Sequence, residues 1–358
     1  ESVTKMSQEY QQENIRAISI SSAFNPLIRM GVLAGFLGTM LIGSYMALSG
    51  TLEVGAYSVL VFLTQRFLWP FTTLSTLIDD FERTMASTKR IFNMMNVDIK
   101  IKNIDSPRLL NDCKVDISFD NVGFSYDNQK PLFKKFNLFI PFGSSIGIVG
   151  DTGSGKTTIA KLLLRLYDID KGKITIGDTP LNTIDISFLR KRIGIVNQSP
   201  FLFNASIKDN IGYGLENLTM DQIEYAANQS QATEFIEKLP RGFDTIVGER
   251  GQMLSGGQQQ RIAIARTVVR NPDIIIFDEA TSSVDNKTEQ LIQRALFNIQ
   301  KGRTSIIIAH RLSTIRNCST IFLIKDGKVV EKGNHESLVT DVNSYYSQLW
   351  DIQTGKKN

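Results

Sequence analysis

The sequence predicts an α-helical transmembrane segment followed by an α/β domain. Residues 30–52, MGVLAGFLGTMLIGSYMALSGTL, contain no charged side chain and are long enough to cross a hydrocarbon core of about 30 Å as a helix. After about residue 105 the pattern changes to β-branched runs, glycine turns and amphipathic helices. The 358 residues also exceed one ordinary domain of about 150 residues. We therefore expect two domains, residues 1–104 and residues 105–358.

Composition restricts the partners and the compartment. The net charge of +4 is too mild to favour nucleic acid as a partner. The two cysteines, Cys113 and Cys318, are too far apart in the chain for a disulfide framework or a cysteine-based zinc site, and burial in a reducing cytosol explains them. The chain begins with Glu1 and shows no signal peptide, so we expect it to be the C-terminal part of a longer protein.

A second apolar stretch, residues 54–78, follows the first after a very short connection around Glu53. The two stretches predict a helical hairpin with spans at about residues 27–49 and 54–78. Basic residues flank the outer ends of this hairpin: Lys5, Arg16, Arg29, Arg83, Lys89 and Arg90. The positive-inside rule makes both outer ends cytoplasmic and the connection external. No further helix breaker stands between Pro70 and Pro107, so we expect the second helix to continue far into the cytoplasm.

Arg66 lies in the middle of the second stretch, beside Gln65. A charged side chain that faces lipid there costs about 2.5–3.5 kcal/mol on insertion scales, so Arg66 is expected to face water or a partner. Three interpretations stay open: a residue that lines a water-filled cavity, an ion pair with a residue elsewhere, or a side chain that reaches the inner headgroups.

Apolar runs at residues 117–126 and 137–150 predict strands, and the second leads directly into the loop GDTGSGKTT. Its glycines allow a tight backbone whose N–H groups turn toward an anion. Lys156 supplies an ammonium group to terminal phosphates, and the Thr157 hydroxyl suits Mg²⁺. The helical pattern of residues 158–167 completes a strand, loop and helix. The sequence therefore predicts a phosphate-binding loop.

A strand buried on both faces is predicted at residues 274–278, where four apolar residues precede Asp278. Asp278 is expected to bind Mg²⁺, and Glu279 to act as a base that polarises water against the terminal phosphate. Two adjacent carboxylates at a strand end are costly unless a cation or nucleotide lies near them, which favours this functional interpretation.

The chain has two histidines. His310 follows another apolar run, residues 304–309, and is open to two interpretations, a structural residue at a strand end or a phosphate contact. His335 lies at a predicted helix start, where we interpret it as a cap rather than a ligand.

A second glycine-rich motif, LSGGQ at residues 254–258, comes directly before a predicted helix. Ser255 and the N–H groups of Gly256 and Gly257 can bind a phosphate at that helix N-terminus.

Together these elements resemble the ATP-binding cassette proteins. The resemblance covers the region after residue 105, in this order: Tyr126, GDTGSGKTT, Gln198, LSGGQ, IIIFDE, SSVD and His310. It implies a P-loop NTPase cassette with a helical subdomain, which binds ATP and Mg²⁺. It also implies that LSGGQ closes over the nucleotide of a second cassette, so that two sites form only when two cassettes meet head to tail.

The resemblance also implies a role for each motif residue. Tyr126 stacks on adenine, and Gln198 senses bound Mg²⁺. Asp285 communicates across the dimer, and His310 contacts the γ-phosphate. The implied catalytic residues are Glu279, His310 and Gln198, and the implied Mg²⁺ ligands are Thr157, Gln198 and Asp278. The implied ATP contacts are Tyr126, Asp151, Thr152, Gly153, Ser154, Gly155, Lys156, Thr157, Thr158, Ser255, Gly256, Gly257, Gln258 and Asp285.

One segment narrows the subfamily. TIVGERG, residues 245–251, resembles a loop of exporters whose membrane and nucleotide-binding domains are fused, and the order of helices then cassette is also theirs. This implies that the two spans are the last two of six, with residues 1–26 as the cytoplasmic extension of the fifth. The intact motifs favour a homodimer of half-transporters, with a heterodimer as the alternative.

Three functions compete. An ATP-driven exporter or flippase in the inner or plasma membrane, with a cytoplasmic cassette and contacts to membrane lipids, accounts for every feature. A soluble cassette ATPase of DNA repair or translation leaves residues 30–52 unexplained, and an importer subunit leaves the fused helices unexplained. The transported substrate is expected to be hydrophobic or amphipathic, with lipid, drug and peptide all open.

Overall fold

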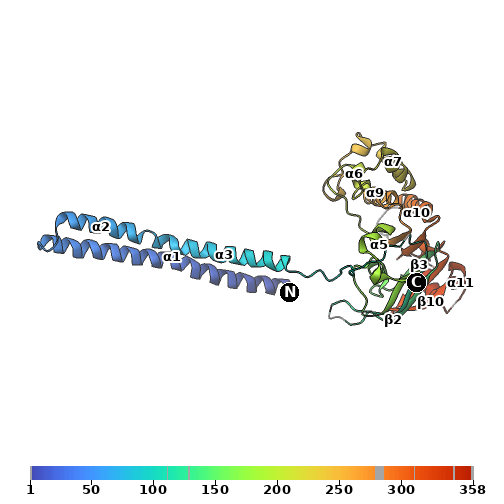
Figure 1. Ribbon diagram of the computed structural model, residues 1–358, viewed down its shortest axis with the longest axis horizontal. Helices are drawn as coiled ribbons and strands as arrows, with labels where there is room; N and C mark the ends of the chain where they lie inside the picture. Colours follow the sequence, from blue (N-terminus) through green and yellow to red (C-terminus); the bar gives the residue numbers. More distant parts are fainter. Residues whose placement is uncertain are drawn as a thin grey trace. The chain divides into compact units, whose positions relative to one another are not determined.

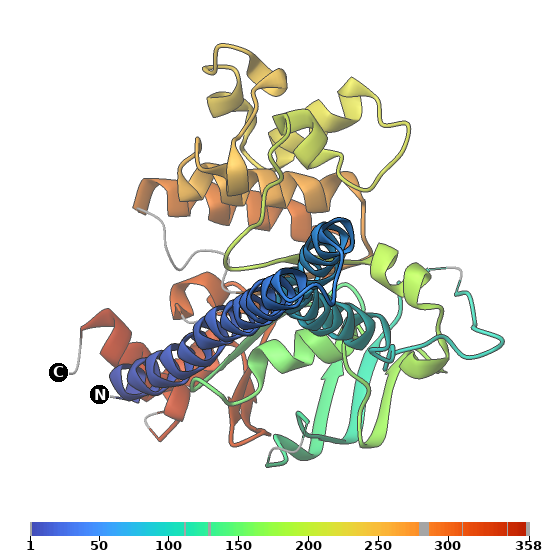
Figure 2. The ribbon, with the colours of Figure 1, turned by 90° about the vertical axis from the view of Figure 1, so that its left-hand side faces the viewer.

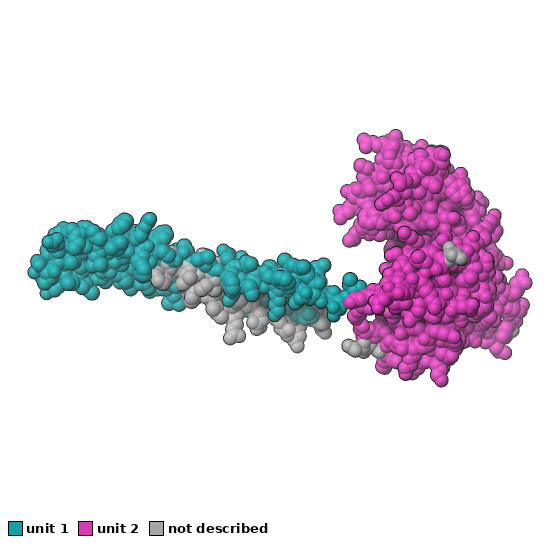
Figure 3. All heavy atoms as spheres, viewed as in Figure 1, with its two compact units in different colours: residues 1–99 teal, residues 100–358 magenta. Residues whose placement is uncertain are grey.

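The computed structural model describes residues 2–110, 112–127, 130–278, 286–309, 311–341 and 343–355. The chain divides into two compact units, Glu1–Ile99 and Lys100–Asn358, which Figure 3 colours separately.

The first unit is helical. Helices α2 (Val54–Leu68) and α3 (Phe71–Met95) both pack along the long helix α1 (Ser2–Leu48), as Figure 1 shows. The chain reverses after α1 at Gly50, whose φ of 74° lies in the left-handed region that glycine adopts without strain. In the described part of the chain, Pro26–Leu48 is the one segment long and apolar enough to span a membrane, and α2 is apolar but shorter.

The second apolar stretch is helical and continues past residue 78, as expected, but its helix is interrupted at Pro70. Helix α2 ends at Leu68, a turn follows at Trp69 and Pro70, and α3 begins at Phe71. Proline has no N–H to donate to the carbonyl of Arg66, four residues earlier, and its ring clashes with that carbonyl. The continuation then ends at Met95, well before Pro107.

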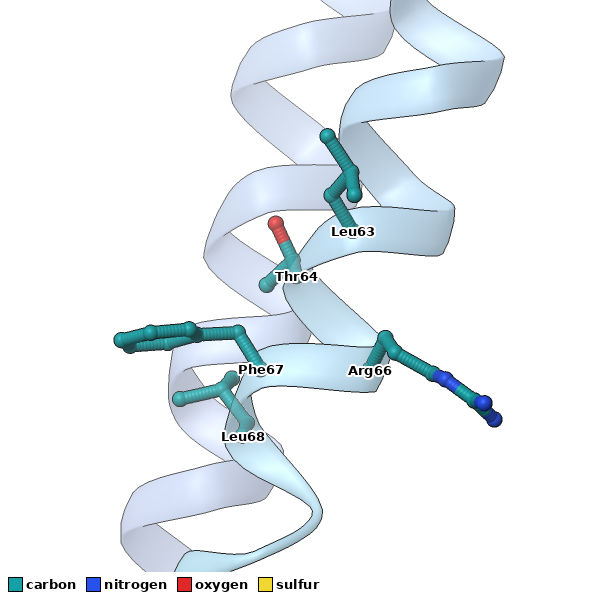
Figure 4. Close-up of a pocket in the computed structure, with 5 residues that line it drawn as sticks. All are labelled: Leu63, Thr64, Arg66, Phe67 and Leu68. Carbon is teal, nitrogen blue, oxygen red and sulfur yellow. The ribbon is translucent and has the colours of Figure 1, made fainter.

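Arg66 lies in the last turn of α2 and is exposed. Figure 4 shows its side chain directed away from α1, on the side opposite Phe67 and Leu68. Leu68 instead packs on α1, because one of its methyl carbons lies 3.5 Å from where a Cβ of Gly35 would be. The three interpretations of Arg66 stay predictions.

The second unit contains two sheets. The larger has the order β10-β9-β3-β8-β7-β6, with parallel neighbours except for β9 and β10. Its strands are β3 (Ser145–Gly150), β6 (Ile193–Val196), β7 (Ile274–Asp278), β8 (Thr304–Ile308), β9 (Thr320–Lys325) and β10 (Lys328–Gly333). The smaller sheet is antiparallel, in the order β2-β1-β4-β5. Its strands are β1 (Ile117–Phe124), β2 (Phe133–Ile140), β4 (Lys171–Ile176) and β5 (Thr179–Pro180).

Both faces of the larger sheet are buried. On β7, Ile274 and Ile276 face a cluster shared with the smaller sheet and α4 (Lys156–Leu163), whereas Ile275 and Phe277 face a cluster of helices. Strands buried on both faces read as continuous apolar runs, as the sequence IIIF does.

The helices of the second unit surround these sheets. Helices α6 (Ile207–Ile211), α7 (Met220–Gln229) and α9 (Gly256–Val269) pack on one another and lie together on one side of the sheets, yellow-green to orange in Figure 2. The remaining α-helices in this unit are α5 (Ile186–Arg192), α8 (Thr233–Ile236), α10 (Asn286–Gln300), α11 (His335–Thr340) and α12 (Tyr345–Thr354).

The predicted single strand at residues 137–150 is also wrong. It is two strands in different sheets, β2 and β3, joined by a turn. Pro141 cannot donate to a ladder, and Gly143 has a φ of 70°, so both residues favour a turn there. The predicted strand at residues 117–126 ends earlier, at Phe124, and the helix predicted to reach residue 167 ends at Leu163.

Candidate nucleotide-binding site

The phosphate loop connects β3 to α4. Its glycines Gly150, Gly153 and Gly155 have φ values of 148°, 83° and 104°, which side chains rarely adopt. A Cβ at Gly150 would lie 2.0 Å from the carbonyl oxygen of Ile324, and one at Gly155 would lie 2.6 Å from the Phe133 ring. A Cβ at Gly153 would meet open space. Packing therefore requires glycine at two positions, and backbone conformation requires it at the third.

The polar groups of this loop suit an anion. The Lys156 side chain is buried, and its Nζ donates to the carbonyl oxygens of Gly150 and Asp151 at 2.8 and 2.9 Å. Ser154 Oγ is buried and makes no hydrogen bond within the described residues. A buried hydroxyl without a partner is costly, and a phosphate oxygen would provide its partner. The residues present therefore fit a triphosphate.

A hydroxyl and a carboxylate meet beside the loop. Thr157 Oγ1 donates to Asp278 Oδ1 at 3.2 Å. Asp278 ends β7, and one strand, β8, separates β7 from β3 in the sheet. Thr157 and Asp278 therefore share the carboxyl edge of these parallel strands. Hard oxygen ligands of this kind suit Mg²⁺, which is usually bound by one or two carboxylates together with phosphates. The described residues contain no group of three or more acidic, histidine or cysteine side chains that would bind a metal alone.

Gln198 is exposed and lies two residues beyond β6, the strand next to β7. The preceding residue, Asn197, accepts a hydrogen bond from Gln260 Nε2 of α9 at 3.1 Å. This hydrogen bond holds the backbone just before Gln198 against α9. The other predicted residues at this edge, Glu279, Asp285 and His310, lie outside the described residues.

Tyr126 packs at the start of α4. Its hydroxyl lies 2.9 Å from Thr158 Oγ1, and its ring makes edge contacts with Phe124 and Tyr167, with ring centroids at 4.9 and 5.1 Å. The adenine contact of Tyr126 stays a prediction.

A cavity of about 590 Å³ lies beside residues 151–154 and is also lined by Pro131 and Leu132. Leu132 approaches within 3.5 Å of the position that a Gly155 Cβ would take.

The LSGGQ motif begins α9 with a capping box. Ser255 Oγ accepts from the backbone N–H of Gln258 at 3.4 Å, and Gln258 Oε1 accepts from the backbone N–H of Ser255 at 2.9 Å. Ser255 and Gly256 are exposed, and nothing lies near a Cβ built at Gly256. Among the described residues these side-chain bonds stay within the motif, so Ser255 and Gln258 stabilise the helix that presents the loop.

The TIVGERG loop is tied to the start of α6 and to α9. Val247 is buried and its N–H donates to Ala205 O at 3.1 Å, and Gln259 Nε2 donates to Gly251 O at 2.9 Å. Glu249 and Arg250 between these anchors are exposed. The loop thus presents charged side chains next to the LSGGQ motif.

The interpretation of His335 as a cap is wrong. Asn334 is the N-cap of α11, since its side chain accepts from the Ser337 N–H at 2.8 Å. His335 Nδ1 instead lies 2.9 Å from the Tyr346 hydroxyl, and burial lowers the pKa of His335. His335 therefore links α11 to α12.

Fold and site together define a P-loop nucleotide-binding domain that follows a helical, apolar segment. The family described as ABC transporter matches residues 133–282. Residues 133–282 belong to this family, which confirms the predicted family and the fold class of the cassette.

Proteins named as flippases and a solved structure named as an exporter are similar to nearly the whole chain. The chain is 37% identical to the ATP-dependent lipid A-core flippase of Legionella pneumophila (strain Paris), over 96% of the chain and 58% of that protein. It is 38% identical to the flippase of the same name from Photorhabdus laumondii subsp. laumondii, over 99% of the chain and 61% of that protein. The solved structure of a bacterial Atm1-family ABC exporter with ATP bound matches with a TM-score of 0.77 and 34% identity, over 96% of this chain and 60% of that one. The chain thus spans about three fifths of the length of the relatives it matches.

Proposed function

We propose that this chain belongs to an ATP-driven exporter or flippase half-transporter. The observation that carries the proposal is the phosphate loop itself. Buried Lys156 and the Ser154 hydroxyl, which has no hydrogen-bond partner among the described residues, adjoin the Thr157–Asp278 pair. The apolar segment Pro26–Leu48 supports a membrane location, with the cassette on the cytoplasmic side.

The residues of the loop bind and orient ATP. Lys156 exchanges its two carbonyl acceptors for phosphate oxygens, and Ser154 and the loop N–H groups donate to the same phosphates. Thr157 and Asp278 would hold Mg²⁺, with Gln198 nearby as a further ligand. Mg²⁺ bound there supplies positive charge that neutralises the phosphates.

Hydrolysis requires a base and a closed site. Glu279 accepts the proton of a water molecule whose oxygen attacks the γ-phosphorus, and the bond to the β–γ bridging oxygen breaks so that ADP retains that oxygen. His310 contacts the γ-phosphate. Ser255 of a second copy closes the site from the other side, so a homodimer holds two composite sites. Asp285 is proposed to communicate between the two copies.

The substrate is proposed to be an amphiphile with an anionic headgroup. Seven relatives at 35–38% identity and 96–99% coverage of the chain carry the name ATP-dependent lipid A-core flippase, which favours a lipid over a drug or a peptide. Arg66, exposed on α2, is the charged side chain proposed to meet that headgroup.

The test measures ATP hydrolysis by the intact protein in lipid nanodiscs. We expect Mg²⁺-dependent hydrolysis that is abolished by Lys156→Ala and stimulated by an anionic glycolipid more than by a hydrophobic cation or a peptide. Hydrolysis that persists in Lys156→Ala would contradict the assignment of residues 150–158 as the loop that binds the phosphates of ATP. If only the peptide or only the cation stimulates hydrolysis, that class of compound, and not a lipid, is the substrate.

A further inference from the structure

The C-terminal helix reaches the phosphate loop through one hydrogen bond. Tyr345, the first residue of α12, donates its hydroxyl to Asp151 Oδ1 at 3.0 Å, across 194 residues of sequence. Nothing in the local sequence of either residue predicts this contact.

Asp151 occupies a central place in the loop. Its carbonyl oxygen accepts from Lys156 Nζ at 2.9 Å and from the Ser154 N–H at 3.2 Å. Its carboxylate is exposed at a loop that receives the negative charge of a triphosphate, and like charges repel. The direction in which this carboxylate is held therefore affects nucleotide binding.

Tyr345 is held in place without its hydroxyl. Glu331 of β10 accepts from the backbone N–H groups of Tyr345 and Tyr346 at 2.6 and 3.1 Å, and from Ser344 Oγ at 2.7 Å. Lys325 Nζ lies 4.7 Å from the centroid of the Tyr345 ring, within reach of a cation–π contact. Replacing Tyr345 by Phe thus removes the contact with Asp151 and keeps the ring, the lysine and the helix start.

The hydroxyl stays a donor in the neutral range. Its hydrogen bond to Asp151 raises the pKa of Tyr345, since ionisation would place two negative oxygens in contact.

We propose that Tyr345 is a positioning residue of the nucleotide site, which holds the Asp151 carboxylate on α12 and thereby tightens ATP binding. The inference rests on the proposed function, because it assumes that the loop binds ATP. When the tie is lost, the carboxylate turns freely beside the phosphates, and the affinity for ATP falls while the chemical step is unaffected.

The experiment compares the intact protein with its Tyr345→Phe variant in nanodiscs, using a fluorescent ATP analogue for Kd and hydrolysis for KM and kcat. A net hydrogen bond of ordinary strength predicts that Kd and KM rise about two- to tenfold, with kcat unchanged. The difference should shrink in high salt, because screening weakens the repulsion. The matched control is Tyr346→Phe. The Tyr346 hydroxyl contacts His335 and not Asp151, so this variant should leave Kd unchanged.

A second background isolates the charge. In Asp151→Asn the carboxylate is absent, so adding Tyr345→Phe should leave Kd unchanged. A full rise of Kd in that background, or an unchanged Kd in Tyr345→Phe alone, would overturn the inference. Intact analogue binding without any hydrolysis by the unaltered protein would instead sink the proposed function, and the Kd comparison would still decide the role of Tyr345.

Discussion

The Thr157 hydroxyl donates to the Asp278 carboxylate at 3.2 Å, although the two residues are 121 positions apart in the chain. One residue comes from the start of α4 and the other from the end of β7, so the fold of the larger sheet builds the pair. This pair locates the proposed Mg²⁺ site more closely than either motif does alone.

Asp278→Asn should weaken Mg²⁺ binding. The amide keeps the shape of the side chain and loses its charge, so we expect the Mg²⁺ concentration for half-maximal hydrolysis to rise about tenfold or more. Titration of hydrolysis with Mg²⁺, together with Mn²⁺ binding followed by electron paramagnetic resonance, measures the effect. The control Asp221→Asn, in the first turn of α7, should behave as the unaltered protein. An unchanged Mg²⁺ requirement in Asp278→Asn would exclude Asp278 as a ligand.

Glu279→Gln should separate binding from hydrolysis. A general base is typically worth about 10²- to 10⁴-fold in rate, so turnover should fall by that factor while the Kd for the fluorescent ATP analogue stays the same. The two quantities are measured on the same nanodisc sample. Turnover at the unaltered rate would refute the role of Glu279 as the base.

Two variants of Ser255 should separate helix capping from phosphate binding. Aspartate is as good an N-cap as serine, whereas alanine costs about 0.5–2 kcal/mol. We therefore expect Ser255→Asp to keep the thermal midpoint of the cassette and Ser255→Ala to lower it, and both to lose hydrolysis. Aspartate loses it because its charge meets the γ-phosphate of the partner copy. Normal hydrolysis by Ser255→Asp would show that no phosphate approaches this residue.

Mixed dimers should reveal shared sites. A Lys156→Ala chain combined with a Ser255→Ala chain leaves one composite site intact, because both lesions fall in the other. Hydrolysis should therefore return in the mixture, while each variant alone stays nearly inactive. If no activity returns, crosslinking a cysteine at position 255 to the partner's phosphate loop distinguishes coupled sites from a wrong arrangement.

The two cysteines should resist thiol reagents until the protein unfolds. Both are buried, and burial raises the pKa of Cys113 to about 12 and that of Cys318 to about 11. At pH 8 about one molecule in 10³ or fewer carries either thiolate, so maleimide labelling should be very slow in buffer and fast in denaturant.

The same shifts set a pH dependence of stability. An unfolded thiol ionises near pH 8.5 and the folded thiols only near pH 11 to 12, so the unfolded state binds fewer protons between these values. The stabilisation is complete below about pH 8.5 and is lost as the pH rises toward 12. A Cys113→Ser variant should show a smaller loss of thermal midpoint over this range. An equal loss in the variant would mean that other groups cause it.

Local chemistry made much of the site predictable. The strand IIIFD, the loop from Gly150 and the capped start of α9 each follow from residues that are neighbours in sequence. The N-cap of α11 also follows from local sequence, because asparagine is a preferred N-cap residue. The cap is therefore Asn334 and not the neighbouring His335.

What the sequence could not provide depends on contacts between distant residues. The hydrogen bond from Tyr345 to Asp151 and the approach of Leu132 to Gly155 arise only when the sheets and α12 are packed. The break at Pro141 was missed for another reason, since a continuous apolar run on both sides concealed the turn.

The interruption at Pro70 removes the usual hydrogen-bond donor of one backbone carbonyl in the second apolar helix. The carbonyl of Arg66 cannot be paired with residue 70, and hydrocarbon offers no donor to replace it. Inside a bilayer, the missing donor would have to come from a neighbouring helix, a nearby side chain, water or a local change of the helix ladder. Arg66 and Trp69 lie within the same turn, and Leu68 between them packs on Gly35, inside the apolar segment Pro26–Leu48. The break at Pro70 thus limits α2 to fifteen residues and leaves a backbone carbonyl that a donor from outside the helix ladder can bind.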